Sequence, residues 1–246
     1  MREDGGMIHT VAADYSQFYI HGVDGWYDPD NIPEELGAGL VQADTHSNLM
    51  FVSFQQWGDL PIDVRVLDAE PAITEETWHD VVELSITPPE PMVLDGWEDV
   101  NPLDLGLEVQ RSYRVRYSVK DADLARDIGT QEDAPFPESY LIEIWPAPVS
   151  PPRVVRGESA NGQYWTFQRD ADRAKLAVSD VPNGAKTAAI VEIGLTEHPE
   201  VARRIARGEA QFQSGILAYA QKIYPHEMEY DKVQELVDHL ARSREW

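Results

Sequence analysis

Acidic and aromatic side chains gather in two short stretches of this chain, where their types and spacing could support chemistry. The first stretch is "VDGWYDPDNIPEE", which contains Asp24, Trp26, Tyr27, Asp28, Asp30, Glu34 and Glu35. The second is "DGWEDV", which contains Asp95, Trp97, Glu98 and Asp99. Neither stretch contains a Lys or Arg. Carboxylates beside aromatic rings can act as acid–base pairs, hold a cation, or bind a basic protein.

The sequence gives little support to catalysis. It contains no Gly-x-Ser-x-Gly motif, no cysteine and no Gly-rich phosphate-binding loop. Glycoside hydrolysis needs two carboxylates near each other. In a chain with 44 Asp and Glu some two carboxylates must lie close together, so such a pair does not indicate this activity. We therefore predict no catalytic residue, no cofactor and no enzyme, and keep a carboxylate- or metal-dependent hydrolase as the least favoured alternative.

Two segments resemble metal sites without completing them. In "PHEMEY", His226 and Glu227 begin a zinc-binding His-Glu-x-x-His motif, but Tyr230 replaces the second histidine. Asp24, Asp28 and Asp30 could offer oxygen ligands to calcium, yet the EF-hand glycine and terminal glutamate are missing. We predict no metal site, and a solvated Asx turn in the aspartate loop.

The net charge of −24 is concentrated in one half of the chain. Residues 1–150 contain 30 Asp and Glu against seven Lys and Arg, a balance of −23, and the remainder is nearly neutral. A negative field repels nucleic acid and anionic membranes and attracts basic proteins. General solubility or adaptation to salt is the alternative, but a host-wide bias would acidify both halves.

Three patterns that would indicate secretion or a membrane are missing from the sequence. The sequence has no cysteine, no apolar run of membrane-spanning length and no signal-peptide pattern at its start. We predict a soluble cytosolic protein without disulfides.

The elements that must position these stretches are mostly strands. Period-2 alternation of apolar and polar residues, interrupted by turn signals, occurs at 15–21, 62–66, 82–86, 113–119 and 140–145, and residues 48–55 form a mostly apolar run. This pattern predicts a mainly β fold, with an antiparallel β-sandwich over residues 1–148.

The chain changes character at "PAPVSPP". We predict a Pro-rich linker at 149–153, followed by a small α+β domain at 154–246 that ends in helices. Short strands are expected at 164–168 and within 175–193, and helices at 197–207, 212–223 and 231–240.

The first part of the chain resembles the ComJ family over roughly residues 13–148. The resemblance lies in "DYSQFYIHGVD" with its acidic loop, in "SYRVRYSV" and in the closing "SYLIEIWPA". It implies a β-sandwich that inhibits a competence-associated DNA-entry nuclease. It implies no catalytic residues, and it does not extend to the C-terminal part.

The sequence therefore favours a non-enzymatic inhibitor or immunity protein that binds a basic protein, such as a nuclease or another DNA-binding protein. The two acid–aromatic stretches are the predicted contact surface. Two alternatives remain open. Trp26 and Trp97 could instead be inner-face residues that cap the sandwich. The chain could also be an assembly module of a phage- or defence-related complex that binds through its C-terminal helices.

Overall fold

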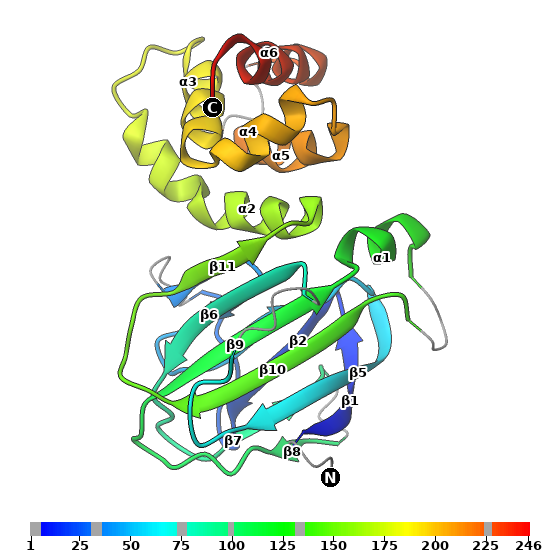
Figure 1. The fold of residues 1–246 in the computed structure, drawn as a ribbon. Helices are drawn as coiled ribbons and strands as arrows, with labels where there is room; N and C mark the ends of the chain where they lie inside the picture. Colours follow the sequence, from blue (N-terminus) through cyan, green and yellow to red (C-terminus); the bar gives the residue numbers. More distant parts are fainter. Residues whose placement is uncertain (1–5, 31–35, 73–77, 98–100, 131–135, 224–227) are drawn as a thin grey trace. The chain divides into compact units, whose positions relative to one another are not determined.

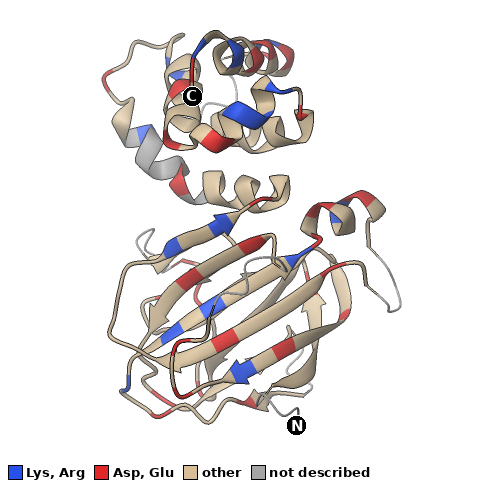
Figure 2. Cartoon of the chain, viewed as in Figure 1, with Lys and Arg blue, Asp and Glu red and all other residues tan. Residues whose placement is uncertain are grey.

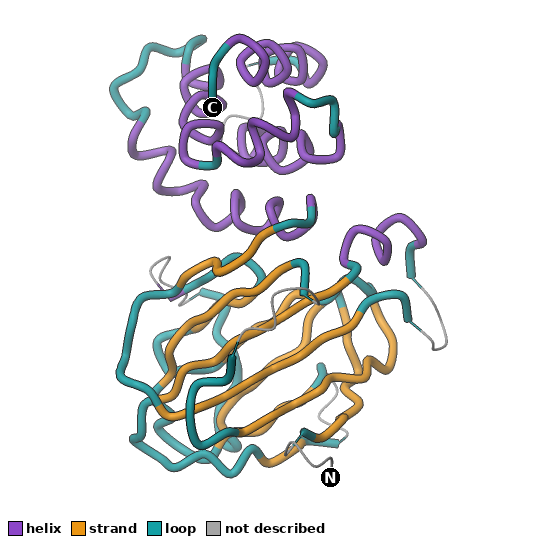
Figure 3. Tube along the Cα trace, viewed as in Figure 1, coloured by secondary structure: helices purple, strands orange, loops and turns teal. Residues whose placement is uncertain are grey.

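The computed structural model describes residues 6–30, 36–72, 78–97, 101–130, 136–223 and 228–246. The chain divides into two compact units, Met1–Ser159 and Ala160–Trp246. Each unit has its own core, and among the described residues all strands belong to the first unit, as Figure 3 shows.

The first unit is one eleven-stranded sheet that curls into a half-barrel (Figure 1). The strand order is β11-β6-β9-β10-β5-β1-β2-β4-β3, and β7 pairs with β2 and with β8. The described pairings are antiparallel, except that β10 runs parallel to β5. The strands are β1 (Met7–Asp14), β2 (Gln17–Gly22), β3 (Val41–Ala43), β4 (Leu49–Val52), β5 (Trp57–Val66), β6 (Asp80–Ile86), β7 (Met92–Asp95), β8 (Leu103–Asp104), β9 (Tyr113–Lys120), β10 (Ser139–Pro146) and β11 (Arg153–Gly157).

The mainly β prediction is confirmed, whereas a sandwich of two separate sheets is not. The curl still brings opposite parts of the sheet together around aromatic rings. Phe51 of β4 stacks on Phe18 of β2 at 5.1 Å between ring centroids and meets Tyr117 of β9 edge-on at 5.1 Å. The Tyr117 hydroxyl donates to the Val52 carbonyl at 2.8 Å. Alternating residues predicted the inner face correctly, because a curled sheet with one face toward the core needs the same alternation as a sandwich.

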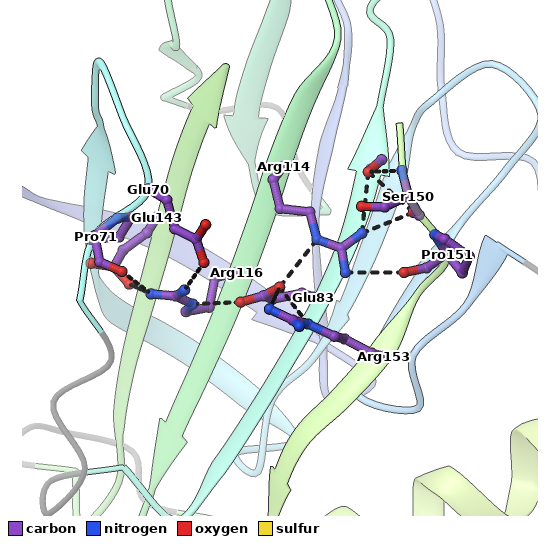
Figure 4. A network of polar contacts seen from close by, with 10 residues as sticks. Glu70, Pro71, Glu83, Arg114, Arg116, Glu143, Ser150, Pro151 and Arg153 are labelled. Carbon is purple, nitrogen blue, oxygen red and sulfur yellow. Dashed lines mark hydrogen bonds and ion pairs between the residues drawn. The ribbon is translucent and has the colours of Figure 1, made fainter. Parts of the chain in front are cut away.

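A buried ion network crosses the outer face of β6, β9 and β10 (Figure 4). The Glu83 carboxylate, fully buried, accepts hydrogen bonds from Arg116 Nε at 2.9 Å, Arg114 Nε at 3.2 Å and Arg153 Nε at 2.9 Å. Burial alone would raise the pKa of Glu83. The hydrogen bonds from Arg116 and Arg114 outweigh this effect and hold the pKa of Glu83 below its ordinary value. The network supplies the charge pairing that buried ions require.

The same network holds the Pro-rich segment. Arg114 donates from Nη1 to the Ser150 carbonyl at 2.9 Å and from Nη2 to the Pro151 carbonyl at 3.0 Å. The chain then forms β11, which pairs with β6. Residues 149–153, expected to be a separating linker, therefore lie on the sheet, and the two units divide after Ser159. Prolines lack an amide donor, but their carbonyls remain good acceptors.

The second unit is helical in its described residues. Its elements are α2 (Ala160–Ala177), α3 (Lys186–Glu197), α4 (Pro199–Ala206), the 3₁₀ turn η2 (Ala210–Phe212), α5 (Gln213–Ile223) and α6 (Tyr230–Ser243). The predicted strands at 164–168 and within 175–193 are wrong, because α2 and α3 occupy these residues. Buried positions of α2 follow helical spacing but include polar residues such as Gln163 and Asp170, which hides the stripe in the sequence.

The short helix α1 (Ala122–Ile128) is a further helix that the strand pattern did not predict. Among the described helices, none has both the length and the apolar character that crossing a membrane demands.

Replacing Glu83 by glutamine should lower the free energy of unfolding by about 3 kcal/mol, because it leaves buried arginine charges without a carboxylate. Urea unfolding monitored by circular dichroism measures this loss. Glu108→Gln is the control, since Glu108 pairs with Arg111 at the surface and its removal should cost less than about 1 kcal/mol. Equal effects of the two changes would show that the network contributes no more than a surface pair.

Asp80 makes stability depend on pH. Its buried carboxylate accepts hydrogen bonds from the Glu158 and Ser159 amides and from the Ser159 hydroxyl. Burial raises the pKa of Asp80 from its ordinary 3.8 to about 6. Between these values the folded state binds more protons than the unfolded state, so this contribution to stability falls as pH rises from about 4 to about 6.

Asp80→Asn should remove this dependence, because the asparagine oxygen can accept from both amides while its amide donates to the Ser159 hydroxyl. The variant should gain stability relative to the parent across pH 4 to 6, by up to about 3 kcal/mol. Urea unfolding at four pH values measures the difference, with Asp127→Asn on the surface of α1 as the control. A difference that stays constant from pH 4 to pH 7 would contradict this account.

Candidate partner-binding face

The alternation of β2 places two kinds of residue on its two faces. Phe18 and Ile20 point into the core, whereas Tyr19 and His21 lie on the opposite face. Along one edge, β2 pairs with β7, so that Tyr19 is opposite Asp95. Tyr19 and His21 are nevertheless buried, at 2% and 4% exposure, because the loop after β2 folds back over them.

Two buried polar side chains hold this loop in place. Asn48 Oδ1 accepts a hydrogen bond from the Gly22 amide at 2.9 Å, and Asn48 Nδ2 donates to the Trp26 carbonyl at 3.1 Å. Asp44 Oδ2 accepts from Asn48 Nδ2 at 2.9 Å and from the Asp28 amide at 3.2 Å. Both side chains are buried, so these bonds are shielded from competing water. The loop that carries Trp26 is therefore fixed at three points along its backbone.

Strand β2, the loop after it and the residues after β7 build a cluster of five rings, which we call the aromatic face: Tyr19, His21, Trp26, Tyr27 and Trp97. Trp26 lies over His21, with ring centroids 4.4 Å apart, and 5.2 Å from the Tyr19 ring. Trp97 meets Trp26 nearly at right angles, 86°, at 6.3 Å. Two sequence stretches seventy residues apart thus form one surface.

Trp97 is held by a close approach of its loop to β1. The Trp97 amide donates to the Ala12 carbonyl at 3.2 Å, and Gly96 lies against the same residue. A Cβ at position 96 would lie only 2.1 Å from the Ala12 carbonyl oxygen. Glycine is therefore required here, and it fixes the backbone from which the Trp97 ring projects.

His21 has an unused hydrogen-bonding atom beneath Trp26. Its Nδ1 donates to the Gly22 carbonyl at 2.8 Å, so in the neutral ring Nε2 carries the lone pair. Nε2 is buried and makes no hydrogen bond to the described part of the protein.

The phenols of the face are neutral hydrogen-bond donors. Burial, followed by the Asp14 charge, raises the pKa of Tyr19 to about 12, and burial raises the pKa of Tyr27 further. Tyr19 donates to Gln17 Oε1 at 2.8 Å and Tyr27 to Gln42 Oε1 at 3.2 Å. Both rings therefore serve packing and positioning at any physiological pH.

The predicted contact residues divide into two groups in the structure. Trp26 and Trp97 are 39% and 51% exposed, which excludes the alternative that they are inner-face residues. The aspartates of the loop, Asp24, Asp28 and Asp30, are also exposed. In contrast, Tyr27 and Asp95 are buried, and Asp95 Oδ1 accepts from the Gly96 amide at 2.7 Å, so these two support the face from below. Glu34, Glu35, Glu98 and Asp99 lie outside the described residues.

The aspartate loop has the predicted Asx turn. Asp28 Oδ1 accepts a hydrogen bond from the Asp30 amide at 3.0 Å. His226 and Glu227 of the incomplete zinc motif lie outside the described residues.

Sequence reasoning missed the residues that support the face. Tyr19 and His21 fall on the polar side of the strand predicted at 15–21, and nothing in the sequence analysis singles out Asp44 or Asn48. A signal for the last two exists in "ADTHSN", because an aspartate that begins a short polar turn often accepts its amides. Asp44 Oδ1 does accept from the His46 and Asn48 amides. Their bonds to the loop 22–28 required the structure.

Comparisons with known proteins show a resemblance in fold. No protein-family model matches the chain, and no curated protein matches it. Among solved structures, the chain is similar to ComJ of Bacillus subtilis, described as an inhibitor of the DNA degrading activity of NucA. That match has 14% identity and a TM-score of 0.38, and covers 57% of this chain and 99% of ComJ. A second match is the protein of crocagin biosynthetic gene J, with 13% identity and a TM-score of 0.38, covering 58% of this chain and 97% of that one. ComJ is thus among the structures that this chain is similar to, as the sequence resemblance predicts.

Asn48→Ala should release the loop, because it leaves the Gly22 amide and the Trp26 carbonyl without their partner. We expect a loss of about 1–3 kcal/mol in unfolding free energy. We also expect at least tenfold faster hydrogen exchange at the amides of Gly22 and Asp28. Amides in the β9–β10 ladder serve as the internal control and should keep their rates until global unfolding. Unchanged exchange at Gly22 would contradict the role assigned to Asn48.

Proposed function

We propose that this chain is a non-catalytic binding protein that captures a basic protein through the aromatic face and the aspartates around it. The observation that carries the proposal is the pair of exposed indoles, Trp26 and Trp97, held in fixed orientation by buried hydrogen bonds. Aromatic residues that are already ordered lose little conformational entropy on binding, which makes them effective anchors.

Charge identifies the kind of partner. Asp24, Asp28 and Asp30 form no ion pair with any described residue, so their charges face solvent. Several of the cations of residues 1–150 form ion pairs away from this loop: Arg114 and Arg116 pair with Glu83, and Arg65 pairs with Asp63. Figure 2 shows Lys and Arg as well as Asp and Glu on the strands of the sheet. The loop is left with an uncompensated negative charge, which attracts a basic surface and repels nucleic acid and anionic lipid.

Arginine is the side chain that matches this face. A guanidinium can stack on an exposed indole and at the same time donate two hydrogen bonds to a carboxylate. Trp26 lies on the same loop as Asp24 and Asp28, so one arginine could reach both kinds of group. Tyr27 and Asp95 act indirectly, by supporting the rings that make contact.

A nuclease is the basic partner that we favour. An enzyme that cleaves DNA presents a cationic channel, because duplex DNA carries one charge per ~1.7 Å of its axis. A rigid acidic face can occupy that channel and exclude the substrate. This is a role of the kind described for ComJ, and we propose it for this chain in the cytosol on the strength of the face itself.

The test uses three variants: a triple variant of the loop aspartates, a double variant of the two indoles, and a control triple variant with the same change in charge as the first. Asp24→Asn/Asp28→Asn/Asp30→Asn should weaken binding to a basic nuclease at least tenfold, and Trp26→Ala/Trp97→Ala should do the same. Asp68→Asn/Asp127→Asn/Glu158→Gln removes three exposed charges elsewhere on the unit and should weaken binding less than threefold. Surface plasmon resonance against a panel of purified basic nucleases, at two salt concentrations, measures these affinities.

For the native pair, the affinity should fall as salt rises, because exposed charges steer the encounter. Equal losses in the two triple variants would mean that only net charge matters, and the proposed face would be wrong. Unchanged binding in Trp26→Ala/Trp97→Ala would likewise show that the proposed face is wrong.

A further inference from the structure

Three metal-ligating side chains meet in the helical unit, independently of the aromatic face. They are Asp170 on α2, Glu197 at the end of α3, and His198 between α3 and α4. One ligand atom from each lies within 4.8 Å of the other two. We call this group the junction cluster. Within the described residues, no other group of three histidine or acidic side chains converges in this way.

The position of His198 is set by both of its helices. Its amide donates to the Gly194 carbonyl of α3, and its carbonyl accepts from the Ala202 amide of α4. Its ring packs edge-on against the buried Phe167 ring, with centroids 4.4 Å apart. Phe167 and Asp170 are three residues apart on α2, so they lie on the same side of that helix. The imidazole is thus directed toward the Asp170 carboxylate.

The distance between His198 and Asp170 is too long for a hydrogen bond and close to that of two ligands on one ion. His198 Nε2 lies 3.6 Å from Asp170 Oδ2, and Nε2 is buried without a hydrogen-bond partner in the described residues. Ligands bound to zinc at about 2.0–2.1 Å in tetrahedral geometry are about 3.4 Å apart. Asp170 is itself 95% buried, so its carboxylate is shielded from solvent.

We propose that the junction cluster binds a divalent transition metal of the zinc class. Imidazole together with carboxylate oxygens selects zinc over calcium or magnesium, which prefer oxygen ligands alone. Glu197 is exposed and gives the ion an entry from solvent. Three protein ligands leave one tetrahedral position for water. The bound ion would connect α2 to the junction of α3 and α4 and so stabilise the helical unit.

The experiment titrates zinc into the full-length chain after chelator treatment and dialysis, using isothermal calorimetry. We expect one zinc ion per chain, and affinity at least tenfold weaker in His198→Ala and in Asp170→Asn. Glu197→Gln changes an exposed side chain, so it should keep the fold and still weaken binding. His239→Ala, an exposed histidine on α6, is the matched control and should bind as the parent does. Cobalt substitution gives a second readout, since tetrahedral cobalt has intense visible absorption that the first two variants should lose.

The alternative is a simple ion pair between protonated His198 and Asp170. In that case zinc would show no saturable binding at one equivalent, and this outcome would overturn the proposal. Binding that is unchanged in His198→Ala and Glu197→Gln would also overturn it. A loss confined to His226→Ala would place the metal elsewhere, with the same consequence. None of these outcomes depends on whether the aromatic face binds a basic protein.

Discussion

The buried hydrogen bonds of Asp44 and Asn48 are the constraint on which the proposed binding face depends. They connect the turn between β3 and β4 to the backbone of the loop after β2, and so fix Trp26 above His21. Without them, the ordering of the loop would have to occur during binding, at a cost in conformational entropy. The face is therefore a property of the folded sheet. Its rings are already ordered in the unbound protein.

The fold also decides which charges remain available to a partner. Six carboxylates of the described first unit are buried: Asp44, Asp80, Glu83, Asp95, Glu138 and Glu143. These groups accept hydrogen bonds inside the molecule and contribute little to the field outside it. Glu83 also accepts hydrogen bonds from three arginines, and through Arg114 and Arg153 this network holds the Pro-rich segment on the sheet. Structural burial and surface electrostatics are thus coupled. The aspartates near Trp26 remain negative partly because the arginines of β9 are occupied elsewhere.

The strand pattern could be predicted because alternation records which residues face the core. Alternation does not record which strands pair, so one curled sheet could not be told from two sheets. The parallel pairing of β5 with β10 has no local signal at all. In the helical unit, Gln163, Thr166 and Asp170 of α2 are polar but buried, so the sequence of α2 shows no apolar stripe that would predict a helix. For the face, composition identified Trp26 and Trp97 separately. Their contact depends on the register of β2 with β7, which only the structure supplies.

Oxidative footprinting of tryptophans in the complex with a captured basic protein tests the central claim most directly. Trp57 on β5 has the same exposure as Trp97, 51%, and serves as an internal reference within the same unit. If the aromatic face is the contact surface, complex formation should protect Trp26 and Trp97 from oxidation at least fivefold and leave the oxidation rate of Trp57 unchanged. Protection of Trp57 with continued oxidation of Trp26 and Trp97 would contradict the account.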